Sequence, residues 1–346
     1  MKITWKHSFQ QVEQFLGVTD RPWIVDPFWE MDTSSFLEGK QIRELPFEAL
    51  VERQLMMNQP SIPDGFTFLL EHFQGGSCVH PIWDEAQRAA DPRKEQTGIL
   101  AFPVPGSKRF LLIVPGGGYY NVCSFVEGYP IAKRCNELGI SAFVLQYRAF
   151  AGAHYPNPQE DAARAVRYIL EHAEAFDLAG TDYAVCGFSA GGHLASSFAV
   201  EQLGYGRFGV PKPQAVLLGY PVVTMTDLTH DGSRRNLLAE DANDDKLRIL
   251  YSVEKQVTAA YPPTYLWNCK ADCVVPAENS AMLESALRKC GVPVTHEIFP
   301  GTTHGWGMGD GTPAQGWFER AIAFWENRSE ERRVGKECRS RWSPYH

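Results

Sequence analysis

No stretch of the sequence is apolar over the roughly 20 residues that a membrane-spanning helix needs. The opening residues, MKITWKHSFQQVEQF, are polar and lack the apolar centre of a signal peptide. The eight cysteines form neither a CxxC pair nor a Cys/His pattern with metal-ligand spacing. These absences predict a cytoplasmic protein with mostly reduced cysteines and no membrane partner.

Basic residues are neither in excess nor clustered. The formal net charge is −8, and no run of Lys and Arg is present to follow a phosphate backbone. We therefore expect no nucleic-acid partner, while the composition leaves a homo-oligomer open. Hydrophobic residues make up 44% of the chain and charged residues 21%, as is usual for a globular enzyme. The 346 residues suffice for one large α/β domain with additional elements.

Short apolar runs alternate with amphipathic stretches from residue 98 onward. This alternation is typical of βαβ units and predicts a mostly parallel sheet with helices on both faces. The expected strands are Gly98–Phe102, Phe110–Val114, Ser141–Gln146, Tyr183–Gly187, Ala215–Gly219, Thr264–Asn268 and Val294–Phe299. The expected helices are Glu127–Leu138, Gln159–Ala175, Glu278–Cys290 and Gln315–Asn327.

The alternation places a catalytic domain at residues 96–327 and leaves residues 1–95 as an N-terminal extension. The extension has one expected helix, Phe47–Met57, and is too apolar for a disordered tail, so we expect it to pack on the core or to shade the active site. Its residues Trp23 and Trp29 are expected to pack in the core.

Two further segments interrupt the pattern. Residues 222–262 lie between two expected core strands, are polar and irregular at first, and become weakly helical around Lys246–Val257; they are expected to form a small cap. Residues 328–346, RSEERRVGKECRSRWSPYH, change abruptly to a basic composition without helical periodicity. They resemble the translation of a sequencing adapter, so we expect a non-native tail.

The segment Gly187-Phe188-Ser189-Ala190-Gly191 is a G-x-S-x-G motif between an expected strand and an expected helix. A tight strand-to-helix turn exposes the hydroxyl at the helix N-terminus, where amide groups favour negative charge, and it requires neighbours without side chains. The motif predicts Ser189 as a nucleophile.

A second glycine-rich segment, Val114-Pro115-Gly116-Gly117-Gly118-Tyr119, also follows an expected strand. Fixed backbone amides that approach a substrate closely can stabilise the oxyanion of a tetrahedral intermediate. We predict that the amides of Gly117, Gly118 and Ala190 form the oxyanion hole.

A serine nucleophile needs an imidazole base and an acid that orients it. His304 follows the last expected strand in a loop that can reach Ser189, whereas the other histidines after Ser189 lie in a strand, in the tail or before the last two strands. Asp272 follows the penultimate expected strand, in the order Ser, acid, His. We predict His304 as base and Asp272 as acid, with His193 as a helix-packing residue.

Four aromatic residues near these motifs are expected to line a substrate pocket: Tyr119, Tyr120, Phe188 and Trp306. Tyr147-Arg148, at the end of an expected strand, is predicted to anchor local structure through an ion pair with Asp161.

The chain resembles bacterial α/β-hydrolase serine esterases, the acetyl esterases and acetylxylan or feruloyl esterase-like proteins. The resemblance rests on five motifs in the same order: PGGGY, Gln146-Tyr147-Arg148, CGFSAGGHLA, KADCVVPAENS and PGTTHGWG. It covers about residues 98–327 and implies an α/β-hydrolase fold, a small-molecule ester substrate with a short, acetyl-type acyl group, and no metal or cofactor. The hormone-sensitive lipase group is more distant, because Pro115 stands where histidine is commoner in its oxyanion loop.

Two alternatives remain open. The same triad could serve a peptidase, an amide hydrolase or a lactone hydrolase, although peptidases of the prolyl-oligopeptidase type usually carry a propeller that 95 residues cannot build. An inactive α/β-hydrolase that acts as a binding module would lack one of the three triad residues, and all three are present here.

Overall fold

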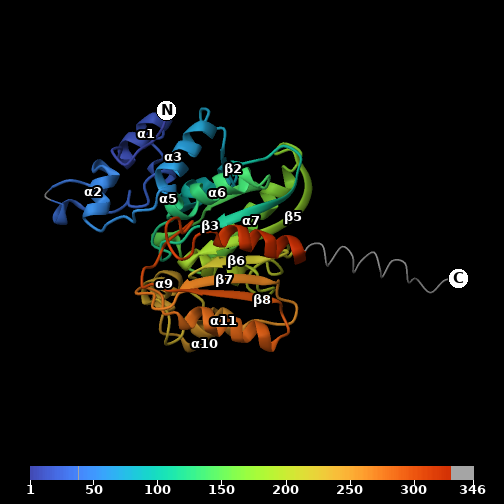
Figure 1. Ribbon diagram of the computed structural model, residues 1–346. Coiled ribbons are helices and arrows are strands. Elements are labelled where there is room, and N and C mark those ends of the chain that lie inside the picture. Colours follow the sequence, from blue (N-terminus) through green and yellow to red (C-terminus); the bar gives the residue numbers. More distant parts are fainter. Residues whose placement is uncertain (38, 329–346) are drawn as a thin grey trace.

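The computed structural model describes residues 1–37 and 39–328 (Figure 1). At its centre is an eight-stranded sheet with the strand order β1-β2-β4-β3-β5-β6-β7-β8. The strands are β1 (Val79–Pro81), β2 (Gly98–Phe102), β3 (Ser107–Val114), β4 (Ser141–Gln146), β5 (Leu178–Phe188), β6 (Val216–Gly219), β7 (Thr264–Cys269) and β8 (Val294–Phe299). From β4 to β8 along this order all pairs are parallel, whereas β1 pairs with β2 and β2 with β4 in antiparallel fashion. The predicted, mostly parallel sheet is confirmed.

Helices cover both faces of this sheet (Figure 1). One face packs against α5 (Ser124–Glu127), α6 (Tyr129–Glu137) and a helix over residues 317–328, and the other against α7 (Asn157–Glu171), α8 (Ser189–Phe198) and α11 (Glu278–Lys289). Side chains of β3 alternate between the two cores, with Leu111 and Ile113 on the first face and Leu112 and Val114 on the second. A strand buried on both faces gives the near-continuous apolar runs seen in the sequence.

Most of the N-terminal extension packs on the first face of the sheet, whereas its residues Ile82 and Trp83 pack on the second. It contributes α1 (Phe9–Leu16), α2 (Phe47–Glu52), α3 (Ser61–His72) and α4 (Glu85–Ala90), and Figure 1 shows α3 beside α5 and α6. Phe9 meets Phe125 edge-to-face at 5.4 Å between ring centroids, so the core of the extension is continuous with that of the sheet. The helix predicted over Phe47–Met57 ends at Glu52, because Gln54 has a φ of +58° that no α-helix accommodates.

The segment predicted to form a cap, residues 222–262, contains α9 (Asp231–Leu238), α10 (Asp245–Leu250) and a short 3₁₀ helix at Val253–Lys255. The last two elements occupy the weakly helical stretch expected around Lys246–Val257.

Of the tail predicted to be non-native, only Arg328 belongs to the described residues. In the described part of the chain no helix is both long and apolar enough to cross a bilayer.

The predicted ion pair of Arg148 with Asp161 is present at the end of β4. The Arg148 guanidinium lies 2.9 Å from the Asp161 carboxylate, and the indole of Trp83 donates a hydrogen bond to the same carboxylate at 3.0 Å. Both charged side chains are buried, and their pairing offsets the cost of burying them. This contact fixes the chain directly after β4.

A pair of buried carboxyls makes the stability of the extension depend on pH. Burial raises the pKa of Glu13 to about 7 and that of Asp26 to about 6, although Arg43 contacts Glu13 and lies 4.0 Å from Asp26. Since both values lie above those of the unfolded chain, their contribution to stability is complete at low pH and is lost as pH rises through 6 to 7. We expect the melting temperature to be roughly 2 °C or more higher at pH 5.5 than at pH 8. Thermal unfolding measured in matched buffers checks this, and a Glu13→Gln variant should show a weaker dependence; equal slopes in the two proteins would contradict it.

Candidate active site

Ser189 lies at the junction of β5 and α8, with a φ of +50°. The two glycines of its motif are required by close backbone contacts. A Cβ at Gly187 would lie 2.3 Å from the carbonyl oxygen of Gly191, and a Cβ at Gly191 would lie 2.2 Å from the carbonyl oxygens of Val114 and Pro115. The strand, the helix and the neighbouring loop therefore meet without side chains between them, and the hydroxyl is raised from the end of the sheet.

His304 and Asp272 meet Ser189 at the carboxyl edge of the parallel strands, because Asp272 follows β7 and His304 follows β8. The His304 Nε2 atom is 2.9 Å from Ser189 Oγ, and His304 Nδ1 is 2.8 Å from Asp272 Oδ2. Asp272 Oδ1 accepts hydrogen bonds of 2.9 Å from the amides of both Val274 and Val275. The three residues predicted from sequence thus form a continuous hydrogen-bonded chain, in which the acid is fixed by its own turn.

The glycine loop after β3 lies beside the Ser189 hydroxyl. The amide of Gly116 donates to Glu127 Oε2 at 2.6 Å, and is therefore already occupied. Within residues 1–37 and 39–328, the amides of Gly117, Gly118 and Ala190 donate to no acceptor. Backbone amides that are free to donate beside a nucleophile are the kind of group that can stabilise an oxyanion.

Glu127 and Tyr220 were not identified from the sequence, yet both lie directly beneath the triad. Glu127 is buried and accepts hydrogen bonds from the Gly116 amide and, at 2.7 Å, from the Tyr220 hydroxyl. The Tyr220 hydroxyl also accepts a bond from the Gly307 amide, and its ring lies edge-on to the His304 imidazole at 4.7 Å. Burial raises the pKa of Glu127. One carboxylate therefore links the oxyanion loop to the histidine loop.

A pocket of about 260 Å³ opens above Ser189 and His304. Its walls are mostly apolar, and they include residues of the extension (Leu55, Met56, Met57 and Ile62), of the α5 region (Phe125 and Val126) and of the loop after Asp272 (Val274). Met57 lies close to Gly305: a Cβ added at Gly305 would be 2.6 Å from the methyl group of Met57. The extension thus covers part of the active site and also packs on the core.

The four aromatic residues predicted to line the substrate pocket do not appear in its wall, among the described residues. Tyr119 points inward, where its hydroxyl bonds His193 Nδ1 at 2.8 Å, and Phe188 packs in the core against Trp317. Trp306 is 9% exposed and covers Gly301. Tyr120 lies on the other side of the glycine loop, in a separate cavity.

His193 has the packing role predicted for it. Its Nε2 lies 2.7 Å from the carbonyl oxygen of Tyr251, to which it must donate, so Nδ1 accepts from Tyr119. Burial lowers the pKa of His193 to about 4, which keeps the ring neutral. This contact explains why Tyr119 turns away from the substrate.

His230 enters the pocket from the segment predicted to form a cap. Its Nδ1 caps α9 by accepting a hydrogen bond from the Ser233 amide at 3.3 Å, and it also lies 2.9 Å from Ser233 Oγ. Burial lowers the pKa of His230. No sequence signal marks this residue, because its place opposite Gly118 depends on the path of the whole segment. In the described residues no group of three or more His, Cys, Asp or Glu side chains is arranged to hold a metal ion.

The chain is similar in sequence to known proteins. A model of the BD-FAE family matches residues 105–287, which is more than half of the chain. An endo-1,4-beta-xylanase B from Butyrivibrio fibrisolvens is 36% identical over 217 residues, covering 60% of this chain and 34% of that protein. An acetylxylan esterase from Xylanibacter ruminicola is 32% identical over 215 residues, covering 61% of this chain and 44% of that protein. The chain therefore spans less than half the length of these two relatives.

A solved structure extends the likeness to the fold. The crystal structure of an acetyl ester-xyloside bifunctional hydrolase from Caldicellulosiruptor lactoaceticus has 31% sequence identity and a TM-score of 0.64. The match covers 72% of this chain and 95% of that one. With the sheet order and the strand-to-helix junction at Ser189, these findings confirm the predicted α/β-hydrolase fold. This chain belongs to the BD-FAE family.

Proposed function

We propose that this protein hydrolyses carboxylic esters, with Ser189 as nucleophile, His304 as base and Asp272 as acid. The observation that carries the proposal is the hydrogen-bonded chain from Ser189 Oγ through His304 to Asp272, which opens on a pocket beside three free amides. The named functions of the relatives support it, since they include an acetylxylan esterase and an acetyl ester-xyloside hydrolase.

In the first half-reaction, Ser189 Oγ attacks the ester carbonyl carbon while His304 Nε2 takes the hydroxyl proton. The carbonyl oxygen becomes an oxyanion, which accepts hydrogen bonds from Gly117, Gly118 and Ala190. When the intermediate collapses, the bond from carbon to the alcohol oxygen breaks and His304 gives its proton to that oxygen. The products are a free alcohol and an acyl group esterified to Ser189.

In the second half-reaction, His304 takes a proton from water as the water oxygen attacks the acyl carbon. The bond to Ser189 Oγ then breaks, and the proton returns to that oxygen. Asp272 stays ionised throughout and holds His304 with a proton on Nδ1, which leaves Nε2 free to accept. Every proton is accounted for by these side chains and water.

The substrate we propose is an acetyl ester on a xylan-type saccharide, as in the names of the relatives. The pocket favours a second candidate for the acyl group. With a water-sized atom group taking about 30 Å³, the three heavy atoms of an acetyl group fill only about 90 Å³. By the same measure, the apolar pocket of about 260 Å³ has room for an acyl group of about eight heavy atoms, so we expect medium-length acyl groups such as hexanoyl to be accepted as well.

Hydrolysis of 4-nitrophenyl esters from acetate to octanoate, with methyl ferulate beside them, tests the activity and ranks the acyl groups. We expect activity in the parent protein and a loss of at least about 10⁴-fold in kcat in a Ser189→Ala variant. Ser196→Ala serves as the matched control, because Ser196 is a buried serine on the same helix whose hydroxyl donates to the His193 carbonyl.

Two results would contradict the proposal. Equal activity in the parent and the Ser189→Ala variant would place the chemistry elsewhere. A folded parent that cleaves 4-nitrophenyl amides or lactones but no ester would favour the amide or lactone hydrolases that share this triad.

A further inference from the structure

His230 brings into the catalytic pocket an imidazole that the triad does not use. It precedes α9, and its Nδ1 accepts the hydrogen bond of the Ser233 amide, so the proton of the neutral ring lies on Nε2. Burial, and after it the nearby His304, lowers the pKa of His230, which keeps the ring neutral. The ring therefore presents one N–H donor, and the helix that it caps fixes its orientation.

This Nε2–H group has no hydrogen-bond partner in the described part of the chain. The other polar side chains in the wall of the pocket are occupied: Ser189 and His304 bond to each other, Glu127 accepts from two donors, and Cys123 donates to a neighbouring side chain at 3.4 Å. Among the described residues, His230 thus offers the one uncommitted side-chain donor of the wall. Such a donor in a mostly apolar pocket is typical of a group that meets a ligand.

The contacts of α9 with the glycine loop hold this donor in place. Asn236 of α9 donates to the Gly118 carbonyl at 2.8 Å, and a Cβ at Gly118 would lie 3.7 Å from His230 Cε1. The chain before His230 is anchored as well, because Asn279 donates to the Leu228 carbonyl at 2.8 Å. A donor fixed in this way needs little reorganisation to meet a developing charge.

The pocket has an apolar side and a polar side. The extension and the α5 region reach it from the first face of the sheet and contribute apolar side chains such as Met56 and Ile62. Helix α9 reaches it from the second face, where Leu237 joins the other core, and contributes His230. An ester bound at Ser189 with its acyl chain against the apolar side therefore has its alcohol oxygen toward His230.

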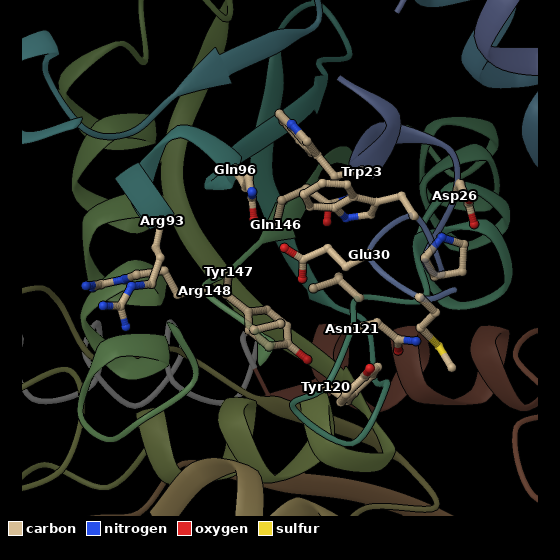
Figure 2. A pocket seen from close by; sticks show the side chains of 15 residues that line it. Trp23, Asp26, Glu30, Arg93, Gln96, Tyr120, Asn121, Gln146, Tyr147 and Arg148 are labelled. Atoms are coloured by element: carbon tan, nitrogen blue, oxygen red, sulfur yellow. The ribbon is translucent and has the colours of Figure 1, made fainter. Parts of the chain in front are cut away.

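The far side of the glycine loop gives the alcohol no room. The cavity there measures about 50 Å³, and its wall includes Trp23, Trp29 and Tyr120 (Figure 2). Trp23 packs against the core as predicted, whereas Trp29 is half-buried outside both cores, so the core-packing role predicted for it is wrong. By the measure used above, this cavity holds fewer than about two heavy atoms, which leaves the α9 side for the alcohol.

The number of donors assigns His230 to the leaving oxygen rather than to the oxyanion. A tetrahedral oxyanion has three lone pairs, and the free amides of Gly117, Gly118 and Ala190 match all three. The alcohol oxygen has two lone pairs, and His304 Nε2 meets only one of them when it delivers its proton. The other lone pair is open to a second donor.

We propose that His230 Nε2 donates a hydrogen bond to the leaving alcohol oxygen, a role that rests on the ester hydrolysis proposed above. This oxygen gains negative charge as its bond to carbon breaks, so the contact strengthens in the transition state. His304 delivers the proton, and His230 transfers none. Because His230 is neutral, it does not oppose the positive charge that His304 carries at that stage. The contact speeds acylation most for esters of poor leaving alcohols.

The test is kcat/KM for acetate esters whose alcohols range from 4-nitrophenol, a good leaving group, to ethanol, a poor one. His230→Asn removes the donor but keeps an acceptor for the Ser233 amide, since asparagine is among the best N-caps. We expect kcat/KM for ethyl acetate to fall by about 10²-fold and that for 4-nitrophenyl acetate to change far less. His230→Gln can place an NH₂ group near the position of Nε2 and should recover part of this loss.

His80→Asn is the matched control and should keep the parent values. His80 is also half-buried with a pKa lowered by burial, and it lies outside the catalytic pocket. A residue that only capped α9 would give the reverse pattern, in which Asn is tolerated and Gln is harmful. That reversal, or an equal loss of kcat/KM for all the esters, would overturn the role of His230.

Nitrogen-15 NMR of the histidine-labelled protein reads the tautomer independently of activity. We expect a proton on Nε2 and none on Nδ1 of His230, with the signals assigned by their absence in His230→Asn. A ring protonated on Nδ1 would overturn the donor role even in an active esterase. A parent with the expected tautomer that cleaves no ester would refute the proposed function, while supporting a free donor in the pocket.

Discussion

An Asp272→Asn variant should lose about 10⁴-fold in kcat on the best 4-nitrophenyl ester while remaining folded. The asparagine Oδ1 can still accept from the amides of Val274 and Val275, so its NH₂ group must face His304 Nδ1. That NH₂ group donates, which forces the imidazole proton onto Nε2. In this tautomer His304 donates toward Ser189 Oγ and can no longer take its proton.

The measurement is kcat as a function of pH, with melting temperature beside it. Asp244→Asn is the matched control, because Asp244 also accepts from two backbone amides, those of Lys246 and Leu247, and lies outside the catalytic pocket. The control should keep the parent kcat. A kcat in Asp272→Asn within about tenfold of the parent would show that another group orients His304.

A Glu127→Gln variant should lower kcat by about 10²-fold, an effect like the loss of one oxyanion donor. Both oxygens of Glu127 accept, one from the Gly116 amide and one from the Tyr220 hydroxyl. A glutamine offers one oxygen and one NH₂ group, so one of these donors loses its acceptor and the glycine loop or the Tyr220 ring must shift. The unpaired group also costs about 1–3 kcal/mol of stability.

Steady-state kinetics and thermal unfolding separate positioning from stability. A residue that only supported the fold would lower the melting temperature and leave kcat of the folded enzyme unchanged, whereas we expect kcat to fall with little change in KM. Glu254→Gln is the control, since Glu254 is also buried with a raised pKa but lies outside the catalytic pocket. An unchanged kcat in folded Glu127→Gln would refute a positioning role.

The sequence correctly predicted those secondary-structure elements that a local pattern of residues specifies. Strands β2, β4 and β8 have the predicted bounds, because β2 and β4 are short apolar runs and β8 is bounded by Pro293 and Pro300. Strand β1 escaped prediction, since Val79–Pro81 is three residues long and half exposed. Ser189, His304 and Asp272 could be placed together because parallel strands bring their carboxyl ends to one edge.

The pocket could not be predicted in the same way. Phe188 continues the alternation of Ala184 and Cys186 and so points into the core, which the period of two could have indicated. Tyr119 turns inward through a φ of +59° and a bond to His193, which lies 74 residues away. The wall formed by Met57 depends on a contact with a loop near residue 305, and no local pattern reports such a contact.

The wall formed by Leu55, Met56 and Met57 has a consequence for how this protein can diversify. Leu55, Met56 and Met57 carry none of the reacting groups, and they precede the segment matched by the family model, which begins at residue 105. A genetic crossover near residue 96 would replace them in one event, while Ser189, Asp272 and His304 are inherited intact. Chimaeras joined there should inherit their preference among acyl groups from the N-terminal parent and their turnover chemistry from the other.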